Sequence, residues 1–308
     1  MLSRRDFLTS TAAAGAALAT QLPQRVAAQA NRRMIVDAQI HLWKAESDDW
    51  KWVPGLQPQL PVPFTIERAI SMMDEAGVDR AVVVPPSWPG DRNDYALEAV
   101  KRYPDRFRVM GRVAIQDPKA LDLLPKWREQ QGMLGVRVIF NTPQTIPWLT
   151  DGTADRFWAA AEKAGLPVMC FAPGHTSAFG KVAEKYPQLQ LILDHMGVSG
   201  AMAPDKVAEG IAETAALAKY PNVSAKVSAS PGLSRQPYPF KDVADHVKRV
   251  FDAYGPQRSY WGTDLTNSYA KASYRQRITQ FTEELPFLSE SDKDQVMGRA
   301  IVARLKWT

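Results

Sequence analysis

Two polar residues, Gln39 and His41, interrupt an otherwise apolar stretch that runs from Val36 to Trp43, "VDAQIHLW". If this stretch is a strand, residues two positions apart point to the same face, so the two side chains lie side by side. A His-x-His pair at this spacing would indicate a metal site, but an amide holds the first position here. The stretch is therefore a metal site, a site that has lost its metal, or a strand that carries two polar side chains.

Ionisable side chains also interrupt four later apolar runs, at Arg137, His195, Lys226 and Asp264. A buried charge needs a partner or a chemical role, because removing it from water is costly. Asp264 could cap a loop or act as a general base on water, and His195 could be a core histidine with satisfied hydrogen bonds. Arg137 cannot lose its charge, so it needs either a buried Asp or a carboxylate on a ligand.

The elements that would position these side chains alternate along the chain. Strand-like runs rich in Val, Ile and Leu, as expected for parallel strands buried on both faces, cover residues 34–42, 80–86, 107–115, 134–140, 166–172, 189–197, 222–229 and 259–265. Amphipathic segments lie between them, and several end at Gly or Tyr-Pro, which are helix-ending signals. The predicted helices cover residues 65–77, 96–104, 155–165, 179–187, 206–221, 241–255, 271–285 and 290–305.

This alternation predicts an α/β fold, a single-domain (β/α)8 TIM barrel, over residues 31–308. An open doubly wound sheet is the alternative, but it usually has fewer strands and a Gly-rich loop after the first one. In a barrel the polar strand ends meet at one mouth, and the polar, Pro-rich segment 44–63 is expected to form a lid or wall there. Strand alternation turns Asp194 away from His195, so we expect it to cap or to pair outside the barrel.

The first 30 residues are predicted to be an export signal rather than part of the fold. Arg4 and Arg5 precede a short Ala-rich apolar stretch, and Ala28–Ala30 forms a small-x-small cleavage pattern. That stretch falls short of the about 20 residues that a spanning helix needs, so a membrane anchor is the less favoured alternative. No segment of the mature chain is expected to span a membrane. We expect export by the twin-arginine route, into the periplasm or beyond.

The remaining composition limits the partners. The formal net charge is +5, of which +2 lies in the first 30 residues, so the mature chain is near +3. This mild and scattered charge argues against nucleic acid. Cys170 is the only cysteine, so no internal disulfide can form. We expect a small-molecule substrate as the partner, and the composition leaves the oligomeric state open.

Three stretches resemble signatures of the amidohydrolase-2 family. "VDAQIHLW" resembles the signature D-x-H-x-H-x-W, "LILDHMG" (191–197) resembles DH-x-G, and "YWGTDLT" (260–266) resembles G-[ST]-D. "GVRV" and "SAKVSA" resemble two softer motifs, and the resemblance covers about residues 34–303. "DHMG" and "GTDLT" look more like the lactonase branch (2-pyrone-4,6-dicarboxylate lactonase and sugar-lactone hydrolases) than the decarboxylase branch.

Two departures from the family pattern bear on a metal. The family's first histidine is Gln39 here, and the fifth-strand histidine of metal-binding members would fall at about Phe171. If a metal is present, His41, His195 and Asp264 are the residues left to hold it. The resemblance also extends to lactonases that work without metal. We therefore expect no cofactor, or one weakly held divalent metal, zinc or manganese.

These observations and the resemblance together predict a hydrolase that opens a lactone or similar cyclic ester of a small, carboxylated substrate with Asp-activated water. The alternatives are a metal-dependent decarboxylase or amidohydrolase of the same family, and an exported binding protein without catalysis. Lys226 would polarise the lactone carbonyl or pair with Asp264. The expected catalytic residues are Asp264, His195 and His41, and the expected substrate-binding residues are Arg137, Lys226, Gln39 and Trp43.

Overall fold

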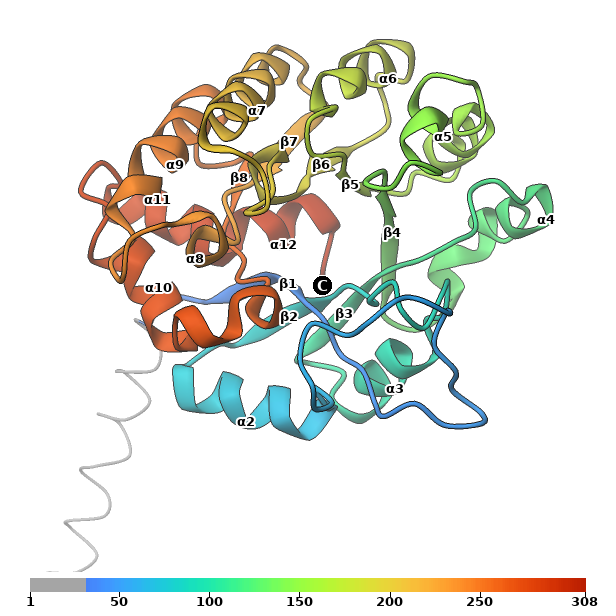
Figure 1. Cartoon of the computed structure of the whole chain (residues 1–308), viewed down its shortest axis with the longest axis horizontal. Coiled ribbons are helices and arrows are strands. Elements are labelled where there is room, and N and C mark those ends of the chain that lie inside the picture. Colours follow the sequence, from blue (N-terminus) through green and yellow to red (C-terminus); the bar gives the residue numbers. More distant parts are fainter. Residues whose placement is uncertain (1–31) are drawn as a thin grey trace, which may run out of the picture. The chain divides into compact units, whose positions relative to one another are not determined.

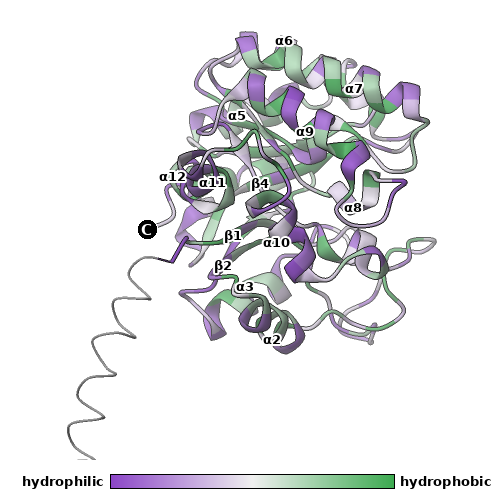
Figure 2. Cartoon of the chain, turned by 90° about the vertical axis from the view of Figure 1, so that its left-hand side faces the viewer, coloured by the Kyte–Doolittle hydropathy of each residue, from purple (hydrophilic) through white to green (hydrophobic). Residues whose placement is uncertain are grey.

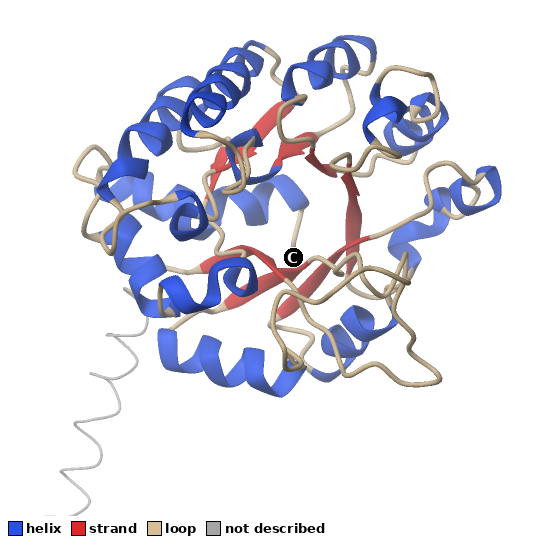
Figure 3. Cartoon of the chain, in the orientation of Figure 1, coloured by secondary structure: helices blue, strands red, loops and turns tan. Residues whose placement is uncertain are grey.

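Parallel strands form the centre of the protein in the computed structural model, which describes residues 32–308 (Figure 3). Within that range eight strands follow one another in sequence order, and each pairs in parallel with the one before it. They are β1 (Val36–Ile40), β2 (Arg80–Val83), β3 (Phe107–Gly111), β4 (Met133–Ile139), β5 (Val168–Phe171), β6 (Leu191–Leu193), β7 (Val223–Lys226) and β8 (Ser259–Tyr260).

Backbone hydrogen bonds bring the two ends of this sheet together. The amide of Ala38 in β1 donates to the carbonyl of Trp261, just after β8, at 3.2 Å. The amide of Asp264 donates to the carbonyl of Gln39 at 3.0 Å. The sheet is therefore a nearly closed barrel, and the first and last segments of the barrel lie side by side.

Helices surround the strands on the outside (Figure 1). Each main helix is amphipathic, which is visible as purple and green stretches along a single helix (Figure 2). Helix α2 begins after Thr65, whose side chain caps the amide of Arg68, and ends at Gly77, where φ is 79°. The helices are α2 (Ile66–Ala76), α3 (Asp94–Arg102), α4 (Pro118–Leu121), α5 (Asp155–Lys163), α6 (Phe179–Lys185), α7 (Pro204–Ala216), α8 (Ser230–Leu233), α9 (Lys241–Tyr254), α10 (Tyr274–Thr282), α11 (Glu290–Asp294) and α12 (Ala300–Leu305).

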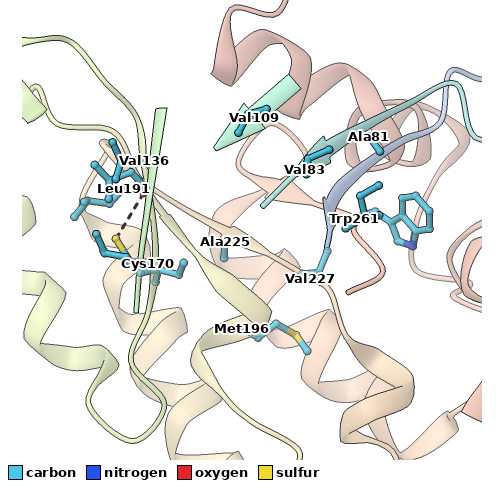
Figure 4. Close-up of a cluster of buried hydrophobic side chains, with 14 of the residues drawn as sticks. Ala81, Val83, Val109, Val136, Cys170, Leu191, Met196, Ala225, Val227 and Trp261 are labelled. Carbon is cyan, nitrogen blue, oxygen red and sulfur yellow. Dashed lines mark hydrogen bonds between the residues drawn. The ribbon is translucent and has the colours of Figure 1, made fainter. Parts of the chain in front are cut away.

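The apolar core includes side chains from most of the strands (Figure 4). Val83, Val109, Val136 and Leu191 are fully buried members of this cluster. Cys170 belongs to the same cluster as a buried free thiol. A thiol in such an apolar cluster packs as a small hydrophobic side chain.

The predicted (β/α)8 barrel is confirmed over residues 35–308, which form one compact unit. All eight strands end earlier than predicted. Among them, β6 ends at Leu193 and β8 at Tyr260. In both places the chain soon enters a left-handed backbone conformation, at His195 and at Asp264, which ends the extended structure. Local apolar patterning does not signal such a turn.

The predicted export signal, residues 1–30, lies outside the described residues. From residue 32 onward, no helix is long and apolar enough to cross a bilayer.

Candidate active site

Three residues at the barrel mouth have a left-handed backbone, although none is glycine. They are His195 (φ 53°), Ala229 (φ 61°) and Asp264 (φ 45°), which follow β6, β7 and β8. L-residues rarely adopt this conformation, and such strain is common where a chain must aim a side chain at a functional site. Each turn ends a strand and places its residue on the wall of one cavity.

Asp264 lies between the two histidines that the sequence singled out. Its Oδ1 is 3.0 Å from Nε2 of His41, and its Oδ2 is 3.6 Å from Nε2 of His195. Burial acts to raise the pKa of Asp264, but the nearby His195 and the hydrogen bond from His41 outweigh it. They hold the pKa of the Asp264 carboxyl well below its usual range, so the carboxylate is ionised at neutral pH.

In both histidines a contact of Nδ1 fixes the orientation of the imidazole ring. Nδ1 of His41 lies 2.7 Å from the carbonyl oxygen of Val84, which can only accept, so Nδ1 donates. Nδ1 of His195 lies 2.9 Å from Oγ of Ser228. Burial lowers the pKa of His195, although Asp264 opposes this effect, so His195 is predominantly neutral at pH 7. Both Nε2 atoms are thereby directed toward Asp264.

The Gln39 amide lies against the same two imidazoles. Its Nε2 is 3.2 Å from Nε2 of His195 and 3.4 Å from Nε2 of His41. Its Oε1 accepts from Nζ of Lys226 at 2.6 Å. An ammonium group can only donate, so this contact fixes which end of the amide is oxygen and turns the N–H end toward the histidines. Neutral His195 can accept that N–H.

Asp194 holds two cations inside the barrel, which corrects the sequence expectation that it pairs outside. Its Oδ1 is 2.8 Å from Nζ of Lys226, and its Oδ2 is 3.2 Å from Nε of Arg137. These cations outweigh burial and lower the pKa of Asp194. The expectation was wrong because it continued strand alternation through residue 195, whereas β6 ends at Leu193. Arg137 thus has a buried Asp as a partner, one of its two predicted options.

A cavity of about 430 Å³ opens over this cluster, and we call it the main cavity. Gln39, His41, Arg137, His195 and Asp264 all border it, so five of the seven predicted site residues meet there. The predicted wall segment 44–63 contributes one lining residue, Gln59, whose side chain bonds to Thr266. Further lining side chains come from Trp88, Asn141, Asn267 and Lys271.

Lys226 and Trp43 do not line the main cavity, which departs from their predicted contact with substrate. Lys226 is fully buried beneath Gln39, so it acts on the site through the amide and does not pair directly with Asp264. Trp43 is also buried and packs edge-on against Trp88 at 5.1 Å, and Trp88 faces the cavity in its place. His175, in the loop after β5, is exposed and lies away from the lining.

Asn141, Asn267 and Lys271 were missed by the sequence reasoning. Asn141 follows β4, and the other two lie in the short helical segment Leu265–Lys271 after β8. The rule that residues just beyond a strand's C-terminal end face the mouth could have found Asn141 and Asn267. That rule was applied only within the apolar runs themselves.

Comparison with known proteins gives the relationships of this chain. The amidohydrolase family model matches residues 36–301. The chain belongs to the amidohydrolase family. It is therefore a hydrolase, and the family predicted from its motifs is confirmed.

The curated relatives of this amidohydrolase include lactone hydrolases, which agrees with the predicted lactonase branch. The chain is 26% identical over 238 residues to L-fucono-1,5-lactonase from Burkholderia ambifaria, covering 74% of this chain and 79% of the relative. It is 28% identical over 218 residues to 4-sulfomuconolactone hydrolase from Hydrogenophaga intermedia, covering 68% and 67%.

Solved structures share the fold. A probable 2-pyrone-4,6-dicarboxylic acid hydrolase from Acinetobacter baumannii, with citric acid bound, has a TM-score of 0.70 at 18% identity. An amidohydrolase from Burkholderia multivorans with bound zinc has a TM-score of 0.75 at 17% identity. Each comparison covers 89% of this chain and 99% of the other chain.

The residues of this amidohydrolase do not make a preformed metal site. His41, His195 and Asp264 are chemically suited to a divalent metal. Yet within residues 32–308 no group of three His, Cys, Asp or Glu side chains is arranged to hold a metal ion. Gln39 directs N–H donors at both imidazoles, and its oxygen is already bonded to the Lys226 ammonium. With its oxygen occupied, the Gln39 amide offers no ligand atom to a cation where other family members have a histidine.

Proposed function

We propose that this amidohydrolase opens a lactone or a similar cyclic ester of a small, carboxylated substrate. The observation that carries this proposal is the ionised Asp264 carboxylate, which faces a cavity and lies between two imidazoles. Such a carboxylate can take a proton from a water molecule. The two lactone-hydrolysing relatives support the same reaction type.

In the proposed reaction Asp264 accepts one proton from water while the water oxygen bonds to the lactone carbonyl carbon. The carbonyl oxygen becomes an oxyanion, which the N–H end of the Gln39 amide stabilises. The ring C–O bond then breaks, and the alkoxide takes the proton held by Asp264. Lys226 contributes indirectly, because its ammonium polarises the Gln39 amide and strengthens its N–H as a donor.

Two cations on the wall of the main cavity support an acidic substrate. Arg137 uses Nε for Asp194 and also lines the main cavity. Lys271 is exposed at the mouth, where its Nζ donates to the carbonyl of Ser234 at 3.2 Å. A carboxylate on the substrate would pair with these groups.

Ring opening of a lactone panel tests the function. Neutral sugar lactones and lactones that carry a carboxylate are offered, and the acid released is followed with a pH indicator. Turnover above the spontaneous rate that falls to background in Asp264→Asn is the expected result. An absence of turnover across the panel, with the same ligands bound tightly, would instead identify the exported binding protein.

Metal analysis separates this proposal from the metal-dependent alternative. The purified enzyme is expected to retain activity after dialysis against a chelator. Stoichiometric zinc or manganese, with activity lost on chelation and restored by the metal, would establish the alternative.

Export through the twin-arginine route is proposed on the residues of the N-terminal segment alone. Arg4 and Arg5 precede an Ala-rich stretch that ends in Ala28–Ala30. Replacing both arginines with lysine is expected to retain the protein in the cytoplasm, as measured by cell fractionation. Unchanged periplasmic recovery of that variant would contradict the assignment.

A further inference from the structure

A second, smaller cavity of about 180 Å³ lies beside the main cavity. The two share Arg137 and Ile139, both in β4, as a common wall. The other polar side chains of the smaller cavity belong to Asp91, Arg112, Gln116 and Thr145, and Trp148 adds an indole. We call it the Arg112 cavity.

Arg112 has an incomplete set of hydrogen-bond partners. It follows β3 directly, and only 12% of its side chain is exposed. Nε pairs with Oδ1 of Asp91 at 3.2 Å, whereas the buried Nη1 has no hydrogen-bond partner among residues 32–308. A buried guanidinium N–H without an acceptor has lost its bond to water, so this arrangement is unfavourable unless a ligand supplies an acceptor.

The positive charge around Arg112 is only partly compensated. The cavity has two guanidinium groups on its wall, from Arg112 and Arg137, and like charges repel. Asp194 forms an ion pair with Arg137, but it also forms one with Lys226, so its charge is shared between two cations. Asp91 is the carboxylate paired with Arg112, and 38% of its side chain is exposed to solvent, which weakens the pair. Burial lowers the pKa of Arg112, and Arg137 acts in the same direction.

We propose that the Arg112 cavity is a binding subsite for a compact oxyanion, held between Arg112 and Arg137. Its volume accommodates a carboxylate, sulfonate or phosphate group, and the planar donor fork of arginine suits such groups. The anion is either free in solution or an acidic substituent of the substrate that reaches past Ile139. A role in binding a substrate substituent rests on the proposed lactone hydrolysis, whereas binding of a free anion does not.

Inorganic sulfate probes the subsite without any turnover. Thermal unfolding of the full mature chain is followed in sodium sulfate and in sodium chloride of equal ionic strength. Wild type is expected to be stabilised by sulfate, and Arg112→Gln is expected to weaken sulfate binding at least about tenfold. Arg102→Gln is the matched control, because Arg102 is an exposed arginine on α3 that pairs with Glu67 at the surface. An equal sulfate response in wild type and Arg112→Gln would overturn the proposal.

Asp91→Asn gives a second test that stays informative if Arg112→Gln fails to fold. This variant removes the carboxylate that competes for Arg112, so sulfate should bind more tightly than to wild type. Sulfate binding that is unchanged or weaker in Asp91→Asn would count against the subsite.

Kinetics distinguishes the two sources of the anion. If the anion is a substrate substituent, Arg112→Gln raises KM for acidic lactones about tenfold and leaves kcat and neutral lactones unchanged, and sulfate competes with acidic lactones. If the anion is free, sulfate binding is lost in the variant with KM unchanged. Either pattern supports the subsite. If Arg112→Gln retains both sulfate binding and affinity for acidic lactones, the proposal is rejected.

Discussion

Two buried carboxylates on neighbouring segments of the barrel have opposite surroundings. Asp37 in β1 accepts hydrogen bonds from the amides of Gln39 and Thr263 at 3.0 and 2.8 Å, and from the hydroxyls of Thr263 and Tyr274. Asp264 instead faces the main cavity and contacts imidazoles. Burial raises the pKa of Asp37, only partly offset by these hydrogen bonds, whereas the pKa of Asp264 is lowered.

Both residues are aspartates, so their contacts rather than their residue type separate a structural carboxylate from a reactive one. The four donors that surround Asp37 occupy its acceptor sites and tie β1 to the segment after β8 and to α10. Asp264 keeps an oxygen near each histidine and remains accessible to a substrate. We therefore assign stability to Asp37 and proton transfer to Asp264.

The largest expected effect is on turnover in Asp264→Asn. An amide cannot accept the proton from water, so kcat should fall by about 10²–10⁴. The fold should persist, as measured by circular dichroism and thermal unfolding. A kcat within a few-fold of wild type would remove Asp264 from the reaction.

Asp37→Asn should show the reverse pattern. An amide group would leave at least one of the four donors without an acceptor, which should lower the free energy of unfolding by about 2–3 kcal/mol. The melting temperature should fall by about 5–10 °C, with kcat of the remaining folded enzyme within tenfold of wild type. Tyr274→Phe, which removes one of the four donors, should show a smaller loss of about 1 kcal/mol. Stability equal to wild type in both variants would contradict the structural role.

Lys226→Met tests whether a buried residue without contact to the main cavity affects catalysis. Lys226 is linked to the Asp264 cluster by its hydrogen bond to Gln39. Without the ammonium the Gln39 amide loses the contact that orients it, so kcat should fall about 10–100-fold while KM changes little. Steady-state kinetics on a neutral lactone measures the split. A change confined to KM would place Lys226 in substrate binding instead.

A smaller effect is expected in the pH profile. Because burial lowers the pKa of His195, its neutral form persists below the ordinary histidine value of about 6.5. Only the neutral imidazole accepts the Gln39 N–H, so kcat/KM should stay level from pH 7.5 to about 6.5 and decline only below that. The same decline of kcat/KM at low pH should be seen in Asp37→Asn. A decline that begins above pH 7 would contradict the neutral assignment of His195.

The sequence predicted the fold and the meeting of Gln39, His41, His195 and Asp264 at one mouth. Both follow from two strong signals, the periodic apolar runs and the polar residues at strand ends. The position of Asp194 could not be predicted, because a left-handed turn at the next residue ends the alternation on which its direction was based.

The buried positions of Lys226 and Trp43 could not be predicted from the sequence either. A polar residue on a barrel strand can face the mouth or lie one layer deeper, and the alternation of side chains does not distinguish the two depths. Lys226 lies in the deeper layer, and Trp43 packs behind Trp88. The Arg112 cavity is lined by segments that are far apart in the sequence, and local patterns do not encode how such segments meet.

Chemical rescue of Asp264→Ala tests most directly whether Asp264 is the base that activates water. Formate is a small carboxylate that can occupy the space left by the side chain and accept the proton in its place. Formate should raise kcat of Asp264→Ala in a saturable manner, chloride at the same ionic strength should not, and Asp37→Ala should not respond. A rate in Asp264→Ala that is indifferent to formate, or a rescue that appears equally in Asp37→Ala, would contradict the division of roles between the two carboxylates.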